Sequence, residues 1–281
     1  MIFVEVYNLQ GQNAQIQKRN HELCVIIPNM KDLNDYFKEN NKAAIAFSGG
    51  VDSTYLMYAA VKAGTDVKAY CVRSAFQPGF ELDDAVKLAE RVGCALSVIY
   101  VDVLSDEKVV SNPADRCYYC KQHIMDTICS AAEADGYMMV CDGTNASDDA
   151  DDRPGFKALG EFGIRSPLRE CGLTKADIRK ASEEAGLPTW NKPAYACLAT
   201  RIRTGERITE RKLQTTEKAE NILYEMGFRD FRVRMRGSDA LVQIAEAQHA
   251  DALAREEEIR SALSGLYDAV NIDESPRVSG L

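Results

Sequence analysis

The stretch Ala43–Thr54, AAIAFSGGVDST, joins a short apolar segment to the start of a helix through Ser-Gly-Gly-Val-Asp-Ser. Two adjacent glycines let the backbone come close to an anion, and the amides at a helix N-terminus point toward it. The hydroxyls of Ser48 and Ser53 can donate hydrogen bonds to phosphate oxygens. The stretch therefore predicts a pyrophosphate-binding loop after a buried strand. An ordinary Ser/Gly turn between a strand and a helix is the alternative.

This loop lacks the Gly-Lys-Ser/Thr sequence with which a Walker loop holds the β- and γ-phosphates of a nucleotide. It resembles instead the PP-loop of ATP pyrophosphatases, which cleave ATP between the α- and β-phosphates and adenylate a substrate. The resemblance implies that ATP binds along six consecutive residues, Ser48, Gly49, Gly50, Val51, Asp52 and Ser53. The chemistry is then the activation of an oxygen, usually that of a carboxylate or a base carbonyl.

The composition limits the class of protein. With 281 residues and 46% hydrophobic side chains, the chain can bury one large and one smaller core, which predicts two domains. A net charge of −9 and a pI near 5.0 disfavour binding to nucleic acid and favour a small-molecule substrate. No signal-peptide pattern and no membrane-spanning segment stand out, so we expect a cytoplasmic protein without membrane contact. The nine cysteines are then expected to be reduced.

Strand-like and helix-like segments alternate up to residue 200, which is typical of an α/β fold with a parallel sheet and helices on both faces. The expected strands are Ala43–Phe47, Val67–Arg73, Leu96–Val103 and Tyr137–Cys141, and the expected helices are Ser53–Ala63, Glu81–Val92, Arg116–Ala134 and Thr174–Ala185. Ligands of such sheets bind at the carboxyl ends of the strands. We therefore expect an uninformative segment 1–22, followed by a PP-loop domain over residues 23–200 with its site at that edge.

Residues 201–281 differ in composition and predict a small C-terminal α+β domain. Its expected elements are a helix over Thr209–Met226, an antiparallel pair over Phe231–Arg236 and Leu241–Ala245, and a helix over Ala247–Leu263. From Arg201 to Arg236 there are ten Lys and Arg residues and six acidic ones. Period-two spacing puts Arg232, Arg234 and Arg236 on one side of a strand. A phosphate-bearing ligand and a solvated basic face both explain this pattern.

Three cysteines lie among polar residues in a pattern that fits catalysis or metal binding. Cys117 and Cys120 are three residues apart at the start of a predicted helix, so their sulfurs share a side and the helix N-terminus is expected to lower their pKa. This spacing fits a metal site, a redox pair or two half-buried thiols. Cys197 lies between Lys192 and Arg201, and these cations favour a thiolate that acts as nucleophile or ligand over a buried filler.

A series of motifs resembles the LarE family of PP-loop sulfur transferases, which make the nickel-pincer nucleotide cofactor of lactate racemase. The motifs are Ser48–Ser53, Asn112–Lys121, Asp142–Asn145 with Asp152–Gly155, Ser166–Leu168, Gly186–Pro193 and Cys197–Arg201. They occur in the family order from about Ala43 to Arg236, and such agreement is more specific than any single motif. The resemblance implies that ATP adenylates a pyridinium carboxylate mononucleotide, that a thiolate displaces AMP, and that C–S cleavage leaves a thiocarboxylate.

The resemblance also implies roles for single residues. Asp52 helps to hold Mg²⁺ at the pyrophosphate loop, and Gly143 and Thr144 lie near the nucleotide. Cys197 is the sulfur-bearing cysteine, with Arg201 beside it as a further catalytic residue. The substrate phosphate is contacted by residues of the C-terminal part, namely Arg232, Arg234 and Glu220.

Members of the family differ in how they supply sulfur. In some, the cysteine at the position of Cys197 is the sole source and becomes dehydroalanine, whereas others use three cysteines to bind a [4Fe-4S] cluster with one open iron. This chain has three such cysteines, Cys117, Cys120 and Cys197, which predicts the cluster type with sulfide or another sulfur donor as partner. The alternative is that Cys197 is itself the sulfur source and is used once. The resemblance also suggests a homo-oligomer. Gln243 departs from the family pattern, because an acid is expected there.

Other functions share parts of these motifs. A tRNA thiolase would use the same loop and cysteines but needs a basic RNA-binding surface, and an amidating ligase would leave the three cysteines without a role. A nucleotide-binding scaffold with structural zinc is an alternative outside the enzymes. The cysteines in apolar runs, Cys71, Cys94, Cys129 and Cys141, are expected to act as small buried hydrophobes.

Overall fold

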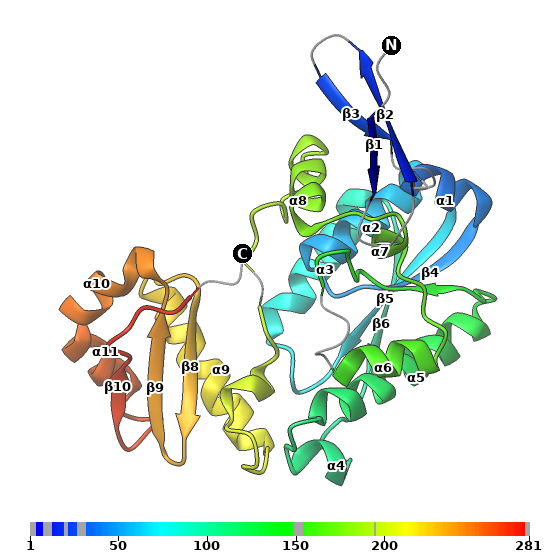
Figure 1. Cartoon of the computed structure of the whole chain (residues 1–281). Helices are drawn as coiled ribbons and strands as arrows, with labels where there is room; N and C mark the ends of the chain where they lie inside the picture. The colour runs from blue at the N-terminus through cyan, green and yellow to red at the C-terminus, as the bar shows by residue number, and fades with distance from the viewer. Residues whose placement is uncertain are drawn as a thin grey trace.

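The computed structural model describes residues 4–7, 13–19, 22–26, 32–148, 154–193 and 195–278. At its centre lies a four-stranded parallel sheet in the order β6-β5-β4-β7 (Figure 1). The strands are β4 (Lys42–Ala46), β5 (Asp66–Arg73), β6 (Ala95–Tyr100) and β7 (Val140–Cys141). Helices connect them, because a parallel pair needs a crossover of this length.

Alternating side chains send apolar groups to both faces of this sheet. Ile45 and Ala69 lie in one core, while Ala44 and Tyr70 lie in the other. The first core includes residues of α1 (Leu33–Glu39), α2 (Val51–Lys62), α3 (Gly79–Val92), α7 (Pro167–Glu170) and α8 (Lys175–Glu184), and the second includes residues of α5 (Arg116–Ala134) and α6 (Pro154–Glu161). The expected α/β sheet with helices on both faces is confirmed.

Two of the predicted strands are longer than the strands that form. The strand expected over Leu96–Val103 ends at Tyr100, whose partner Arg73 is the last residue of β5. The strand expected over Tyr137–Cys141 is reduced to β7, because the residues before it close the end of α5. The N–H of Tyr137, for example, donates to the carbonyl of Ala132 at 2.8 Å.

An antiparallel three-stranded sheet, β1-β2-β3, precedes the core, and the sequence pattern did not predict it. Its strands are β1 (Val4–Tyr7), β2 (Asn13–Arg19) and β3 (Glu22–Ile26). It projects from the side of the core that carries α1 and α8 (Figure 1). Within the described ranges, none of the helices combines the length and the apolarity needed to cross a membrane.

The C-terminal part is an α+β unit with its own core. Its elements are α9 (Glu210–Glu225), β8 (Phe231–Arg236), β9 (Asp239–Ile244), α10 (Glu246–Ala254), α11 (Glu256–Leu263) and β10 (Val270–Ile272). The predicted antiparallel pair is confirmed, with Arg232 opposite Gln243. The third strand, β10, pairs parallel to β9 and was not predicted. Phe228, Val233 and Val242 are fully buried between this sheet and its helices.

The single helix predicted over Ala247–Leu263 is wrong. Arg255 leaves the helical conformation and separates α10 from α11, and its Nη1 donates to the carbonyl of Met226 at 3.2 Å. Three glutamates, Glu256, Glu257 and Glu258, then occupy the first turn of α11. Their negative charge at this position complements the dipole of a new helix, which favours a second start over continuation.

A fourth apolar cluster joins the two parts at the carboxyl edge of the parallel sheet. It contains Phe76 after β5, Leu198 in the short 3-10 helix η1 (Leu198–Arg201), and Leu213 in α9. The short helix α4 (Glu107–Val110) contributes to it as well. The boundary predicted at residue 200 falls inside η1. The C-terminal unit is thereby held against the edge where the site was predicted.

Candidate functional site

The predicted pyrophosphate loop lies between β4 and α2, at the carboxyl end of β4. Gly49 has a φ of 71°, which L-residues with side chains rarely adopt, and Gly50 is the N-cap of α2. The hydroxyls of Ser48 and Ser53 lie 3.1 Å apart across the loop. Because glycine has no side chain to cap the helix, the first amides of α2 can donate to a bound anion.

The loop after β7 lies directly on the pyrophosphate loop. A Cβ on Gly143 would lie 2.8 Å from the backbone nitrogen of Ser53, so this position admits glycine alone without movement. Asp142 fixes the loop by accepting from the Thr144 hydroxyl at 2.6 Å and from the Ser166 hydroxyl at 2.7 Å. The structure therefore places Gly143 and Thr144 beside the cradle, where they were expected.

Asp52 faces a lysine that the sequence analysis missed. Its carboxylate accepts from Lys175 Nζ at 2.5 Å and from Asn145 Nδ2 at 3.4 Å. Lys175 is the first residue of α8, and the capping box formed by Thr174 and Asp177 fixes that turn. The capping pattern was visible in the sequence, but the distance from the loop along the chain hid the contact. A cation from α8 thus stands at a loop that has no lysine of its own.

The three predicted metal-binding cysteines come together at this edge. Cys117 and Cys120 lie in the first turns of α5, and Cys197 directly precedes η1. Cys120 and Cys197 both pack on the cluster around Phe76, while Cys117 is exposed. Cys120 is close enough to the other two for their charge to affect its pKa. The prediction that these thiols lie near one another is therefore confirmed.

The expectation that their pKa values are lowered is wrong for the two partly buried thiols, Cys120 and Cys197. Burial raises the pKa of Cys120 to about 12, and it raises the pKa of Cys197 as well. Lys192 does not favour the Cys197 thiolate as expected, because its ammonium bonds to Asp84 at 2.7 Å. Both sulfurs are therefore neutral thiols in the chain by itself, and a bound cationic centre would be needed to make them thiolates.

One arginine that the sequence analysis missed does reach the sulfurs. Arg116 Nη2 lies 3.7 Å from Cys117 Sγ and 4.0 Å from Cys197 Sγ. Its Nη1 donates to Asn112 Oδ1 at 2.6 Å and to the carbonyl of Ala199 at 3.2 Å. Attraction to Arg116 is the largest effect that lowers the pKa of Cys197, although burial outweighs it.

The three cysteines are not arranged around the position of a single metal ion. Within the part of the chain that the structure describes, no group of three or more His, Cys, Asp and Glu side chains is placed to hold a metal ion. A [4Fe-4S] cluster does not need its ligands around one point, because each thiolate binds a different iron. Three cysteines from two segments, with the positive charge of Arg116 beside them, suit such an anionic group.

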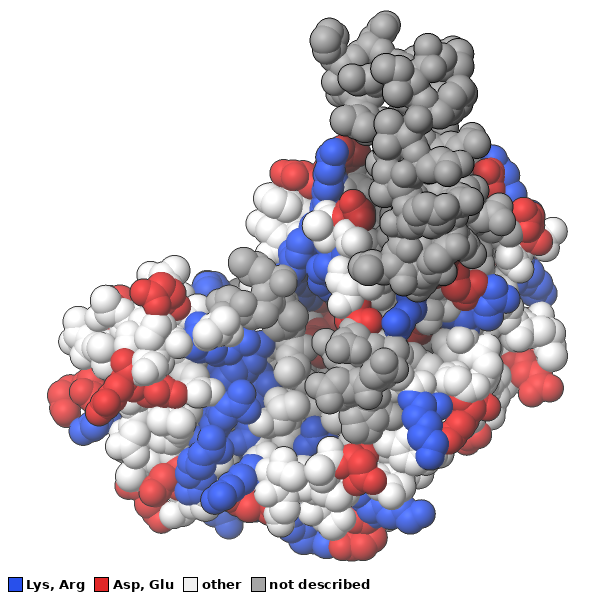
Figure 2. All heavy atoms as spheres, in the orientation of Figure 1, with Lys and Arg blue, Asp and Glu red and all other residues white. Residues whose placement is uncertain are grey.

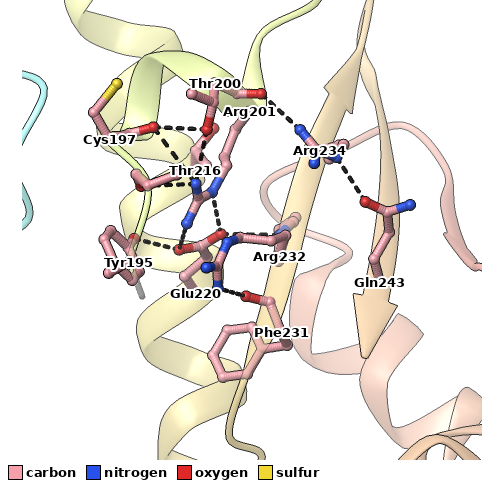
Figure 3. A network of polar contacts seen from close by, with 12 residues as sticks. Tyr195, Cys197, Thr200, Arg201, Thr216, Glu220, Phe231, Arg232, Arg234 and Gln243 are labelled. Atoms are coloured by element: carbon pink, nitrogen blue, oxygen red, sulfur yellow. Dashed lines mark hydrogen bonds and ion pairs between the residues drawn. The ribbon is translucent and has the colours of Figure 1, made fainter. Parts of the chain in front are cut away.

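The residues predicted to contact the substrate phosphate belong to one polar network between η1, α9 and β8 (Figure 3). Arg201 is fully buried and donates to Glu220 through Nε at 2.8 Å and Nη2 at 3.2 Å. Glu220 also accepts from the Tyr195 hydroxyl and, at 3.0 Å, from the N–H of Val233. A buried ion pair needs such additional bonds to be stable. Arg201 meets the Cys197 segment through the carbonyl of Ala196, at 2.8 Å.

The two strand arginines lie next to this pair. Arg232 is 5% exposed, and its guanidinium lies 5.1 Å from the centre of the Tyr195 ring. Burial, with the charges of Arg201 and Arg277, lowers the pKa of Arg232 to about 10. An anion bound here would relieve the repulsion among these guanidinium groups. Glu220, by contrast, already accepts from several donors, so its phosphate role stays a prediction.

Gln243, which stands where an acid was expected, links Arg234 to an acid further along the chain. Arg234 Nε donates to Gln243 Oε1 at 2.6 Å, and Gln243 Nε2 donates to Asp273 Oδ2 at 2.8 Å. Arg234 also donates to the carbonyl of Thr200 at 2.8 Å. Figure 2 shows Lys and Arg side chains gathering in a band over β8 and α9, beside this network. Asp273, the residue after β10, is therefore linked to Arg234 only through the amide of Gln243.

A carboxyl group that the sequence analysis missed lies between the loop and the network. Glu81 is in the first turn of α3, and its backbone carbonyl is 3.8 Å from the place of a Cβ on Gly49. Burial raises the pKa of Glu81 to about 7, although Lys192, Arg201 and Arg73 lower it. The sequence did contain a signal for Glu81, because an acid in the first turn of a helix at the ligand-binding edge is a candidate site residue.

Comparisons with known proteins add to this geometry. No family model matches the chain. It is 38% identical over 220 residues to the uncharacterized protein slr1717 of Synechocystis, covering 78% of this chain and 82% of that protein. It is 33% identical over 231 residues to the pyridinium-3,5-bisthiocarboxylic acid mononucleotide synthase of Lactiplantibacillus plantarum, covering 82% of this chain and 84% of the synthase. The uncharacterized protein MJ0830 of Methanocaldococcus jannaschii is 30% identical over 215 residues, covering 76% of this chain and 82% of that protein.

The parallel sheet, with its glycine loop at the carboxyl edge, defines an α/β protein with a Rossmann-like core. The similarity to the Lactiplantibacillus synthase extends over both parts of the chain. The chain therefore belongs to the LarE family of that synthase.

Proposed function

We propose that this protein is an ATP-dependent sulfur transferase that turns a carboxylate of a pyridinium mononucleotide into a thiocarboxylate. The observation that carries the proposal is the 33% identity to the pyridinium-3,5-bisthiocarboxylic acid mononucleotide synthase, which covers 82% of this chain. The convergence of Cys117, Cys120 and Cys197 supports a [4Fe-4S] cluster as the place where sulfur is held. The product places the enzyme in nickel-pincer nucleotide synthesis.

In the first step a carboxylate oxygen of the substrate attacks the α-phosphorus of ATP, and the bond to the β-phosphate oxygen breaks. The products are an acyl adenylate and pyrophosphate. The amides of Gly50 and Val51 and the hydroxyls of Ser48 and Ser53 are suited to stabilise the leaving pyrophosphate. Asp52 would hold Mg²⁺, which prefers carboxylate and phosphate oxygens.

Lys175 changes partner in this proposal. In the chain alone its ammonium neutralises Asp52. When Mg²⁺ takes that carboxylate, Lys175 becomes available to a phosphate oxygen of ATP, at a loop that has no lysine of its own. The loop residues Gly143 and Thr144 keep the cradle in place during this exchange.

In the second step a sulfur nucleophile attacks the acyl carbon, and AMP leaves with the bonding electrons. The cluster, when bound by Cys117, Cys120 and Cys197, supplies an open iron that can carry sulfide. Arg232 and Arg234 hold the substrate phosphate, so that the ring carboxylate lies between the ATP loop and the sulfur-bearing edge. The second candidate, sacrifice of Cys197 itself, is favoured by its position at the same edge.

The products of the reaction and the mass of the protein test this proposal together. We expect AMP and pyrophosphate to form only when a carboxylate acceptor is present, with the protein mass unchanged after turnover. ADP and phosphate as products would contradict the adenylation step. Loss of H₂S from the protein mass would show that Cys197 is the donor.

A further inference from the structure

Arg116 is a buried cation without the partner that such a group needs. Its side chain is 7% exposed, and within the described ranges no ion pair joins it to a carboxylate. The other buried arginines each lie beside an acid: Arg201 is 2.8 Å from Glu220, and Arg232 is 3.9 Å from Asp230. A buried charge that is not neutralised costs several kcal/mol in folding free energy. The missing partner of Arg116 is therefore expected to be an anion.

The groups that Arg116 faces are sulfurs. Its Nη2 lies 3.7 Å from Cys117 Sγ and 4.0 Å from Cys197 Sγ. Its Nη1 is held by Asn112 Oδ1 at 2.6 Å and by the carbonyl of Ala199 at 3.2 Å. These two acceptors fix one end of the planar guanidinium, so the other end is directed at the pair of sulfurs.

We propose that Arg116 is a positioning residue that neutralises and holds anionic sulfur at Cys117 and Cys197. This sulfur belongs to the cluster that the two cysteines would hold, so the inference rests on the proposed function. Positive charge and N–H donors near an iron-sulfur cluster favour its reduced state, so Arg116 raises the reduction potential of the cluster.

The loaded protein tests this role of Arg116. The parent, Arg116→Gln and Arg116→Lys are each reconstituted with iron and sulfide without oxygen, and the iron per chain and the reduction potential are measured. We expect Arg116→Gln to bind severalfold less iron and its remaining cluster to have a more negative potential. Arg116→Lys, which keeps the charge, should lie closer to the parent. Parental iron content and potential in Arg116→Gln would overturn the inference.

A matched variant separates this role from packing. Arg116→Lys keeps the positive charge, but one ammonium cannot keep all four contacts of the guanidinium. The inference requires a larger shift of the potential in Arg116→Gln than in Arg116→Lys. An equal shift in both variants would show a packing effect and overturn it. If Arg116→Gln does not fold, Arg116→Met, which also removes the charge, replaces it in the comparison.

Iron binding by the parent separates this inference from the proposed function. A parent that binds no iron would contradict the cluster of the proposed function. A parent that binds iron, matched by Arg116→Gln in iron content and potential, would overturn the role of Arg116 alone.

Discussion

Replacement of Gly143 by alanine should disturb the ATP loop through a single added methyl group. The new Cβ would lie 2.8 Å from the backbone nitrogen of Ser53, 3.1 Å from its Cα and 3.2 Å from the Cβ of Asp52, and none of these atoms is the far end of a flexible side chain. The contact must open to about 3.4 Å, so either α2 or the loop after β7 must move. Forced overpacking of this kind costs about 1–3 kcal/mol.

Urea unfolding and calorimetric titration with ATP measure the two consequences of Gly143→Ala. We expect the free energy of unfolding to fall by about 1–3 kcal/mol and ATP to bind about tenfold more weakly, because the amides that meet its phosphates move with Ser53. Gly160→Ala in α6 is the control, since nothing lies within 4 Å of the added Cβ. That variant should be as stable as the parent or more so. Parental stability and ATP affinity in Gly143→Ala would refute the reasoning.

Three further changes test other parts of the site. Lys175→Ala should weaken ATP binding at least tenfold in the presence of Mg²⁺. Lys180 is exposed on the same helix, so Lys180→Ala should leave the affinity for ATP unchanged. Equal ATP affinity in the two variants would show that Lys175 is not part of the site. Glu220→Gln should lower the free energy of unfolding by about 3 kcal/mol, because it leaves a buried guanidinium unpaired, while the exposed Glu225→Gln should not change the urea midpoint. Glu81 keeps its proton in the folded protein between pH 4.5 and about 7, where the unfolded chain has lost it, so this group makes the parent less stable as pH rises through that range. The free energy of unfolding of Glu81→Gln, measured relative to the parent, should therefore rise by up to about 3 kcal/mol between pH 4 and pH 8. Parallel pH profiles of the two proteins would contradict the raised pKa of Glu81.

The sequence was most informative where local pattern determines structure. The apolar run before Ser48, the two glycines and the helix start after them predicted β4, the loop and α2 correctly, because all three depend on neighbouring residues. The pair β8 and β9 was equally predictable, since its alternation and its turn are local. Family resemblance then brought Cys117, Cys120 and Cys197 together, which spacing alone could not do.

Features that depend on the folded environment were not predictable. The pKa values of Cys120 and Cys197 rise because both thiols are partly withdrawn from water, which the sequence does not show. Lys175 and Arg116 meet their partners through contacts between segments distant in the chain, so neither stood out as a site residue. Glu220 looked like a ligand for phosphate, but in the fold its carboxylate pairs with a buried arginine.

The central claim is that ATP is used to place sulfur on a pyridinium mononucleotide at the edge formed by Cys117, Cys120 and Cys197. The most direct measurement is an incubation of the iron-loaded protein with ATP, Mg²⁺, sulfide and the pyridinium dicarboxylate mononucleotide without oxygen, followed by mass spectrometry of small molecules and protein. The account predicts AMP, pyrophosphate and more than one thiocarboxylate per chain, with the protein mass unchanged. A nucleotide that keeps both oxygens of its carboxylates while ATP is consumed would contradict it.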